Sequence, residues 1–138
     1  MSAAALLVRL EGVRQTGSGR WLARCPAHDD QHPSLSIREL DNGRVLIHDF
    51  AGCSPHDVLN AIGLPFSALF PDGARGQRLP HERRPFAAHD VLRCVAHHAL
   101  VCAIAASDAV AGRLSGVDAE RAMQAAGLIL DALDTVKN

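Results

Sequence analysis

Polar and apolar side chains alternate over short stretches in the first half of the chain. Residues 34–38 read Ser-Leu-Ser-Ile-Arg, and residues 45–48 read Val-Leu-Ile-His. The run Asp-Asn-Gly at 41–43 lies between them and is typical of a tight hairpin turn. The pattern predicts an antiparallel β-hairpin, preceded by another short strand over residues 20–24.

Apolar residues recur at helical spacing on both sides of this hairpin. Residues 1–12 predict a short N-terminal helix with leucines on one side. Ser54 is a good N-cap, the proline that follows suits the first helical position, and Gly63 is placed to end a helix. The stripe that would lie against the sheet consists of Val58, Leu59 and Ile62.

The composition changes after residue 64. Residues 65–88 are rich in proline, glycine and arginine, and they predict a basic, mobile linker. Beyond it, two alanine-rich segments at 89–112 and 117–136 predict helices joined by a turn at 114–116. They suit an antiparallel helical hairpin, whose second face would need to be covered by something else.

Composition and charge restrict the classes of protein that fit. The chain has 138 residues, 48% hydrophobic and 21% charged, which is typical of a folded soluble protein. No apolar run approaches the roughly 18 residues that a membrane span needs, so we expect no membrane association. The net charge of −1 argues against a protein held on nucleic acid by bulk electrostatics, but it is compatible with a local basic face.

The four cysteines have no secretory segment in front of them, which indicates a reducing, cytoplasmic compartment. In a reducing compartment, Cys and His residues are interpreted as metal ligands before they are interpreted as a disulfide framework. Only 4% of the residues are aromatic, so the core is thin, and small proteins with thin cores commonly use a metal or a partner.

Two short cysteine-containing knuckles flank the predicted hairpin. Cys25 and His28 have the spacing that lets a tight knuckle aim both side chains at one tetrahedral metal, and Cys53 lies where the hairpin returns. Asp49 or His48 would supply the fourth ligand. Because adjacent residues of a strand point to opposite faces, only one of them should reach the metal, and we favour Asp49. The spacing predicts one structural Zn²⁺.

Other interpretations of these residues are open. Both cysteines could be small buried apolar residues, or the zinc could be catalytic with an open position, although no general base or pocket is evident. Asp29 and Asp30 follow the first knuckle, and their carboxylates would orient His28 or accept backbone hydrogen bonds. A second set on the first long helix, which we interpret as packing residues in preference to ligands, is Cys94, His98 and Cys102.

The motifs in order are Cys25-Pro26-Ala27-His28, Pro33-Ser34-Leu35 and Ala51-Gly52-Cys53. Between Leu7 and Leu64 this order resembles the zinc-finger domain at the N-terminus of bacterial, phage and plasmid DNA primases. The expected fold is α+β: a zinc ribbon with a short antiparallel sheet and flanking helices at 1–64, the linker at 65–88, and the helical hairpin at 89–138.

The resemblance implies one zinc held by Cys, His, Cys and Cys, with Asp49 at the place of the third cysteine. It also implies binding to single-stranded template DNA during replication of a phage or mobile element. The polymerising site of such primases lies in separate domains, so we expect no catalysis from this chain alone. The partner would be a replication protein such as a primase, polymerase or helicase subunit.

Basic and aromatic residues on or beside the predicted strands could form a sequence-tolerant single-strand site. The alternative is that the ring of Trp21 packs in the small core and the basic residues form a solvated face. These candidates are Arg20, Trp21, Arg24, Arg38 and Arg44. A second hypothesis is a protein-interaction adaptor, in which zinc is purely structural and the helical hairpin docks a partner or self-associates.

Overall fold

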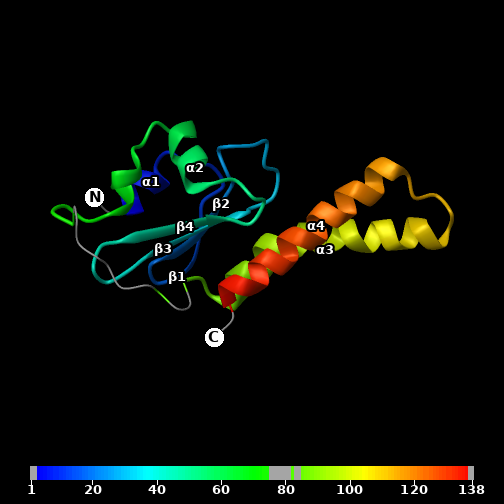
Figure 1. Cartoon of the computed structure of the whole chain (residues 1–138). Coiled ribbons are helices and arrows are strands. Elements are labelled where there is room, and N and C mark those ends of the chain that lie inside the picture. Colours follow the sequence, from blue (N-terminus) through cyan, green and yellow to red (C-terminus); the bar gives the residue numbers. More distant parts are fainter. Residues whose placement is uncertain (1–2, 75–81, 83–84, 137–138) are drawn as a thin grey trace.

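The four strands form one antiparallel sheet in the order β1-β2-β3-β4 (Figure 1). The computed structural model describes residues 3–74, 82 and 85–136. Together with the helices around the sheet, this arrangement confirms the α+β class and the C-terminal helical hairpin. The strands are β1 (Arg14–Gly17), β2 (Arg20–Ala23), β3 (Leu35–Glu39) and β4 (Val45–Asp49).

Strands β2, β3 and β4 match the segments predicted from the pattern, whereas β1 was not predicted. The tight turn between β3 and β4 is also present: Gly43 has φ 81°, and the Arg44 N–H donates to the Asn42 side-chain oxygen at 3.0 Å. Strand β1 is short and polar, and its pairing with β2 is irregular after Gln15. It therefore lacks the apolar alternation by which a strand is recognised in a sequence.

One face of the sheet is covered by α1 (Ala3–Leu7), α2 (Pro55–Ala61) and the 3₁₀ helix η1 (Phe66–Leu69) (Figure 1). Leu35 and Ile37 of β3 are completely buried in the core between these layers. The predicted start of α2 is confirmed, because the Ser54 hydroxyl accepts a hydrogen bond from the Asp57 N–H at 3.1 Å.

Helix α1 is shorter than the helix predicted over residues 1–12, so that prediction was wrong in length. From Arg9 onward the backbone hydrogen bonds reach back three residues: the Arg9 N–H donates to the Leu6 carbonyl and the Leu10 N–H to the Leu7 carbonyl. Gly12 then adopts φ 64° and turns the chain toward β1. Residues 1–2 lie outside the described residues.

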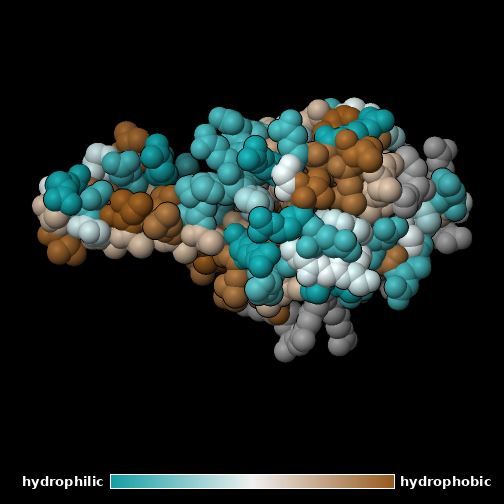
Figure 2. Space-filling view, turned by 180° about the vertical axis from the view of Figure 1, so that it is seen from behind, coloured by the Kyte–Doolittle hydropathy of each residue, from teal (hydrophilic) through white to brown (hydrophobic). Residues whose placement is uncertain are grey.

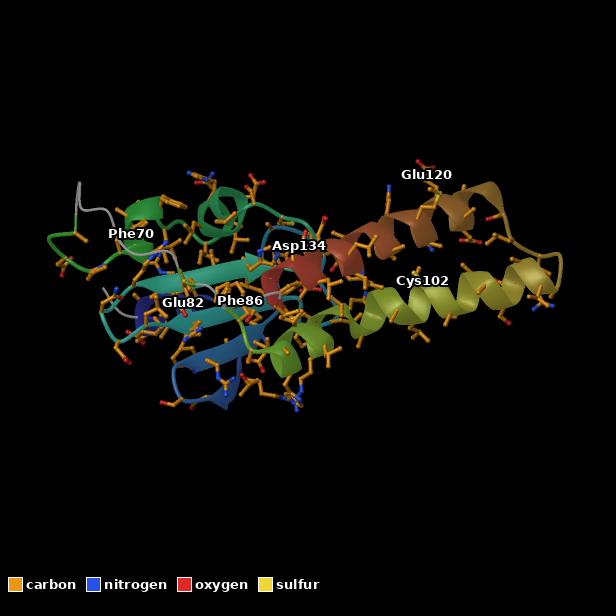
Figure 3. The ribbon with its side chains drawn as sticks, turned by 60° about the horizontal axis from the view of Figure 1, so that its bottom comes forward. Phe70, Glu82, Phe86, Cys102, Glu120 and Asp134 are labelled. Atoms are coloured by element: carbon orange, nitrogen blue, oxygen red, sulfur yellow. The ribbon has the colours of Figure 1, made fainter. Side chains whose placement is uncertain are left out.

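The segment expected to be a linker begins as packed structure. Within it, Ala68 and Leu69 of η1 are buried against the sheet. At its other end Phe86 is only 6% exposed and packs against the opposite face (Figure 3). Residues 75–81 and 83–84, which fall in the same segment, lie outside the described residues.

The second face of the sheet is covered by the base of the helical hairpin, α3 (Ala88–Val110) and α4 (Gly116–Val136). Phe50, at 2% exposed, is a central residue of this apolar cluster. Two polar contacts add to it: the Thr16 hydroxyl donates to the buried Asp90 carboxylate at 2.8 Å, and His98 Nε2 lies 3.1 Å from the Phe50 carbonyl oxygen. The sheet is therefore sandwiched between two layers of helix.

The outer part of the hairpin projects beyond the sheet (Figure 1). Both helices agree with the predicted segments to within one or two residues. At the tip, the Asp118 N–H donates to the Ser115 hydroxyl at 3.1 Å, and that hydroxyl donates to the Asp118 carboxylate at 2.8 Å. The Ser115 hydroxyl thus caps the first turn of α4.

Candidate metal centre

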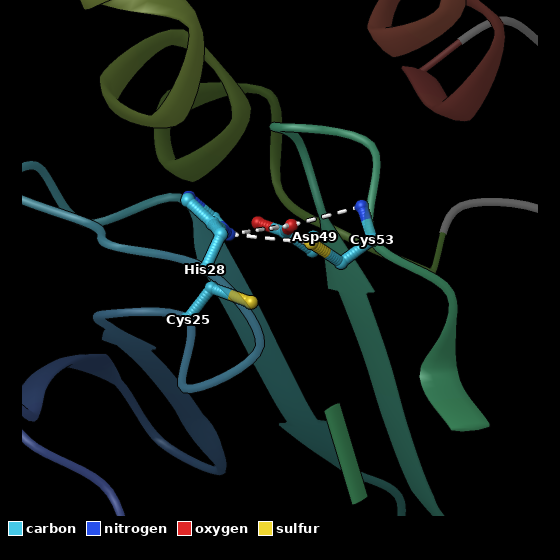
Figure 4. A group of neighbouring side chains, drawn as sticks. All are labelled: Cys25, His28, Asp49 and Cys53. Atoms are coloured by element: carbon cyan, nitrogen blue, oxygen red, sulfur yellow. Dashed lines mark hydrogen bonds and ion pairs between the residues drawn. The ribbon is translucent and has the colours of Figure 1, made fainter. Parts of the chain in front are cut away.

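Four possible metal ligands converge between the loop after β2 and the loop after β4 (Figure 4). One donor atom from each of Cys25, His28, Asp49 and Cys53 lies within 4.8 Å of every other. In a tetrahedral site with metal–sulfur bonds of 2.3 Å, two thiolates lie about 3.8 Å apart. The four donors therefore need only a small contraction to hold a metal ion.

The strand register brings the two loops together. Leu35, at the start of β3, pairs with Ala23 at the end of β2 and with Asp49 at the end of β4. Both knuckles therefore leave the same end of the sheet. Gly52 adopts φ 102° in the second knuckle, a conformation that residues with a side chain rarely adopt, and its backbone turn directs Cys53 back toward Cys25.

Asp49 is the most constrained of the four residues. Its side chain has no exposed surface. Oδ1 lies 2.6 Å from the Ser34 hydroxyl and 3.3 Å from the Ala51 N–H, and Oδ2 accepts the Cys53 N–H at 3.0 Å. Oδ2 is also 3.7 Å from His28 Nδ1, so this oxygen faces the cluster. Asp49 thus shapes the second knuckle and offers it a ligand oxygen.

His28 presents its Nδ1 atom to the cluster, 3.2 Å from the Cys53 sulfur. Its other ring nitrogen, Nε2, lies 3.5 Å from Asp30 Oδ1. A carboxylate on the far ring nitrogen is the usual second partner of a metal-binding histidine, because it orients the ring and holds the proton away from the metal.

Asp30 also fixes the first knuckle, because its Oδ2 accepts the Cys25 N–H at 2.7 Å. The Ser34 hydroxyl lies 2.7 Å from the same oxygen and 2.6 Å from Asp49, so its one proton is shared between the two carboxylates. The sequence had placed Asp29 and Asp30 together in this supporting role, and the described contacts belong to Asp30.

Burial raises the pKa of the Cys25 thiol far above its usual value, and the nearby Asp49 carboxylate adds to the increase. Burial also raises the pKa of Cys53, followed by the hydrogen bond and negative charge of Asp49. Both thiols are therefore protonated when no cation is near. A divalent ion would reverse this effect by displacing the protons, so metal affinity increases with pH.

His48 does not take part in this cluster. It pairs with Ser36 on the other face of the sheet, where its ring lies 4.5 Å from the ring of Phe50. Burial lowers the pKa of His48, which keeps the ring neutral among its apolar neighbours. Strand alternation thus separates the two alternatives for the fourth ligand, as the sequence suggested it would.

Substitution of Asp49 tests its contribution to the site. Asp49→Asn should retain a hydrogen-bond acceptor for the knuckle but lose the anionic ligand, so the metal dissociation constant should rise by at least tenfold. Asp49→Cys should bind more tightly than the natural chain. His48→Ala is the matched control, and isothermal titration should show an unchanged constant; a loss of affinity only in His48→Ala would contradict the ligand set.

The remaining cysteines lie in the hairpin. Cys94 is buried against the sheet, and burial, assisted by the charge of Asp90, raises its pKa to about 12. The Cys102 thiol donates to the Ala122 carbonyl of α4 at 3.5 Å (Figure 3). Cys94 thus packs against the sheet and Cys102 against α4, as expected of packing residues.

The five DNA-binding candidates do not form one surface. Arg20 and Arg38 are paired across β2 and β3, and both line a hollow beside the start of α3. Trp21 points to the other face and packs against the core. Arg24 lies beside Gly12 near the first knuckle, whereas Arg44 lies over the Phe70 ring at the β3–β4 turn.

The fold and the cluster define an α+β protein with a candidate Cys₂-His-Asp metal site at one end of its sheet. The chain matches no family model, no curated protein and no solved structure.

Proposed function

We propose that the chain is a zinc-binding protein that engages single-stranded DNA in the manner of a primase zinc finger, as an accessory to a separate replication protein of a phage or mobile element. The observation that carries the zinc assignment is the convergence of two cysteine sulfurs, a histidine nitrogen and a buried carboxylate oxygen. Two soft sulfur donors with one imidazole in a closed, four-donor arrangement favour structural Zn²⁺ over Mg²⁺ or Ca²⁺.

The DNA-binding part of the proposal is supported by Arg20 and Arg38. The two arginines line one hollow together with Ser18 and Ala88, the first residue of α3, and the N-terminal end of a helix favours anions. Arg38 donates to the Pro85 carbonyl oxygen at 3.1 Å and lies 3.7 Å from Glu82, so a phosphate would compete with that carboxylate. Arg20 is therefore the cleaner residue to test.

Arg20→Ala should weaken binding to a fluorescent oligothymidylate several-fold and reduce the salt slope by about 0.7, the loss expected for one phosphate contact. Fluorescence anisotropy at several salt concentrations measures both quantities. The matched control is Arg113→Ala, at the tip of the hairpin, which should bind as the natural chain does. Absence of binding by the natural chain at about 0.15 M salt would refute the DNA-binding proposal.

Trp21→Ala and Arg24→Ala identify the face that is used. A loss of DNA affinity in these variants, with Arg20→Ala unchanged, would move the DNA site to the knuckle end and the opposite face of the sheet. Circular dichroism of each variant separates this result from unfolding, which matters most for Trp21 because its ring packs against the core.

The exposed surface of the hairpin favours the adaptor hypothesis as a second candidate. Several large apolar side chains on α3 and α4 are more than half exposed, which is unusual for a monomer whose core is small. The two proposals are compatible, because the hollow at Arg20 and Arg38 lies at the base of the hairpin whereas most of these side chains lie farther along it.

A further inference from the structure

Each helix of the hairpin carries an apolar stripe at alternating spacings of four and three residues, the spacing of helices that pack against other helices. In these two stripes every side chain except the half-buried Ala119 is exposed to solvent. The exposed fractions of Val110, Met123 and Leu130 are 92%, 77% and 64%. The α3 stripe consists of Leu92, Ala96, Ala99, Ala103, Ala106 and Val110. The α4 stripe consists of Ala119, Met123, Ala126, Leu130 and Leu133.

Both stripes lie on the side of the hairpin that faces away from the sheet. Asp90 and His98 mark the side of α3 that touches the sheet, and Leu128, which lies against Gly52, marks that side of α4. An α-helix advances about 100° per residue, so each stripe lies roughly opposite these contacts. The Cys102–Ala122 contact places the two helices side by side, so the stripes form one apolar face.

This face is large enough to be half of a four-helix bundle. With α3 of 23 residues and α4 of 21, the hairpin is about 30 Å long and about 20 Å wide. Two such faces would bury on the order of 1,200 Å² in total, the lower end of stable protein interfaces. Neither stripe contains a charged residue, and Figure 2 shows brown, apolar side chains along the projecting hairpin.

We propose that the hairpin face binds a second copy of this chain, with α3 of each copy packed against α4 of the other. The sizes are complementary, because the middle of the α3 stripe is alanine and the α4 stripe offers Met123, Leu130 and Leu133. A two-fold axis parallel to the helices produces this pairing and leaves both sheets at the same end of the bundle.

The charges beside the stripes favour the same pairing. The outer edge of α3 carries Arg93, whereas the outer edge of α4 carries Glu120, which points away from α3 (Figure 3), and Asp131. Packing α3 against α4 brings opposite charges together. The alternative pairing, α4 against α4, would bring acidic edges together, which disfavours it.

The experiment is sedimentation equilibrium of the full zinc-loaded chain over a range of concentrations. We expect a mass of twice 14.7 kDa at tens of micromolar, and the chain mass of 14.7 kDa for the double variant Met123→Glu/Leu130→Glu. Both substituted side chains are mostly exposed, so the monomer should remain folded. The matched control is Gln124→Glu, an exposed neighbour outside the stripe, which should remain dimeric.

Arg93→Glu tests the pairing of the helices and should raise the dimer dissociation constant about tenfold, because it places acid against acid. A monomeric natural chain at all concentrations, or a double variant that stays dimeric, would overturn the proposal. By length and mean composition alone, helix α3 could also cross a membrane, although charged and polar residues interrupt its apolar runs. A natural chain that floats with phosphatidylcholine vesicles and is monomeric without them would likewise overturn it.

Discussion

A Cys25→Ser variant is expected to lose its metal altogether. The serine hydroxyl is nearly the same size as the thiol but stays neutral, so three ligands remain where structural zinc requires four. The natural chain should contain about one zinc by elemental analysis, and the variant close to none. Because metal binding stabilises only the folded state, the variant should also unfold several kcal/mol more easily.

The matched control is Cys102→Ser, which changes the same atom in the hairpin. Its thiol only donates to the Ala122 carbonyl, and a hydroxyl can do the same, so zinc content should be unchanged. A chelator added to the natural chain should reproduce the lower unfolding temperature of Cys25→Ser. A Cys25→Ser protein that retains one zinc, or a natural chain whose stability is indifferent to chelator, would remove the basis for a structural metal.

Phe50→Ala is expected to be the most damaging substitution outside the metal site. Phe50 is only 2% exposed, and it fills the space between the sheet and the base of the hairpin with Leu22, Phe86 and Val91. Removing a buried phenylalanine ring costs about 3–5 kcal/mol. Thermal denaturation should show a midpoint lower by on the order of 10 °C.

Phe66→Ala is the matched control for Phe50→Ala. Its ring is 41% exposed and stacks on His56 at the surface, so the loss should be well under half as large. Equal losses in the two variants would show that the Phe50 cluster does not hold the hairpin to the sheet.

The features predicted correctly from the sequence are local. The turn at Gly43 and the cap at Ser54 depend on a few consecutive residues, so both can be recognised in the sequence before the fold is known. The same is true of Asp49 and His48, because strand alternation alone separates them. The four candidate ligands could also be predicted from the sequence, because a β-hairpin brings the segment after its second strand close to the segment before its first strand.

The features that were missed depend on contacts between distant residues. Strand β1 forms because β2 supplies a partner, and its own polar residues give no signal. The burial of Phe86 requires the hairpin to lie on the sheet, a contact that no local pattern encodes. Arg20 and Trp21 are a different case: the sequence had grouped them in one DNA surface, but as adjacent residues of β2 they point to opposite faces, which strand alternation alone predicts.

The strand order β1-β2-β3-β4 has a consequence for how the chain folds. Every pair of neighbouring strands is also consecutive in the sequence, and α3 and α4 are joined by a short loop, so each unit forms by closing short loops. Docking of the hairpin is different, because Thr16 must find Asp90, 74 residues away. The sheet and the hairpin can thus form separately and fast. The slower step is their docking, because it closes the long loop between Thr16 and Asp90.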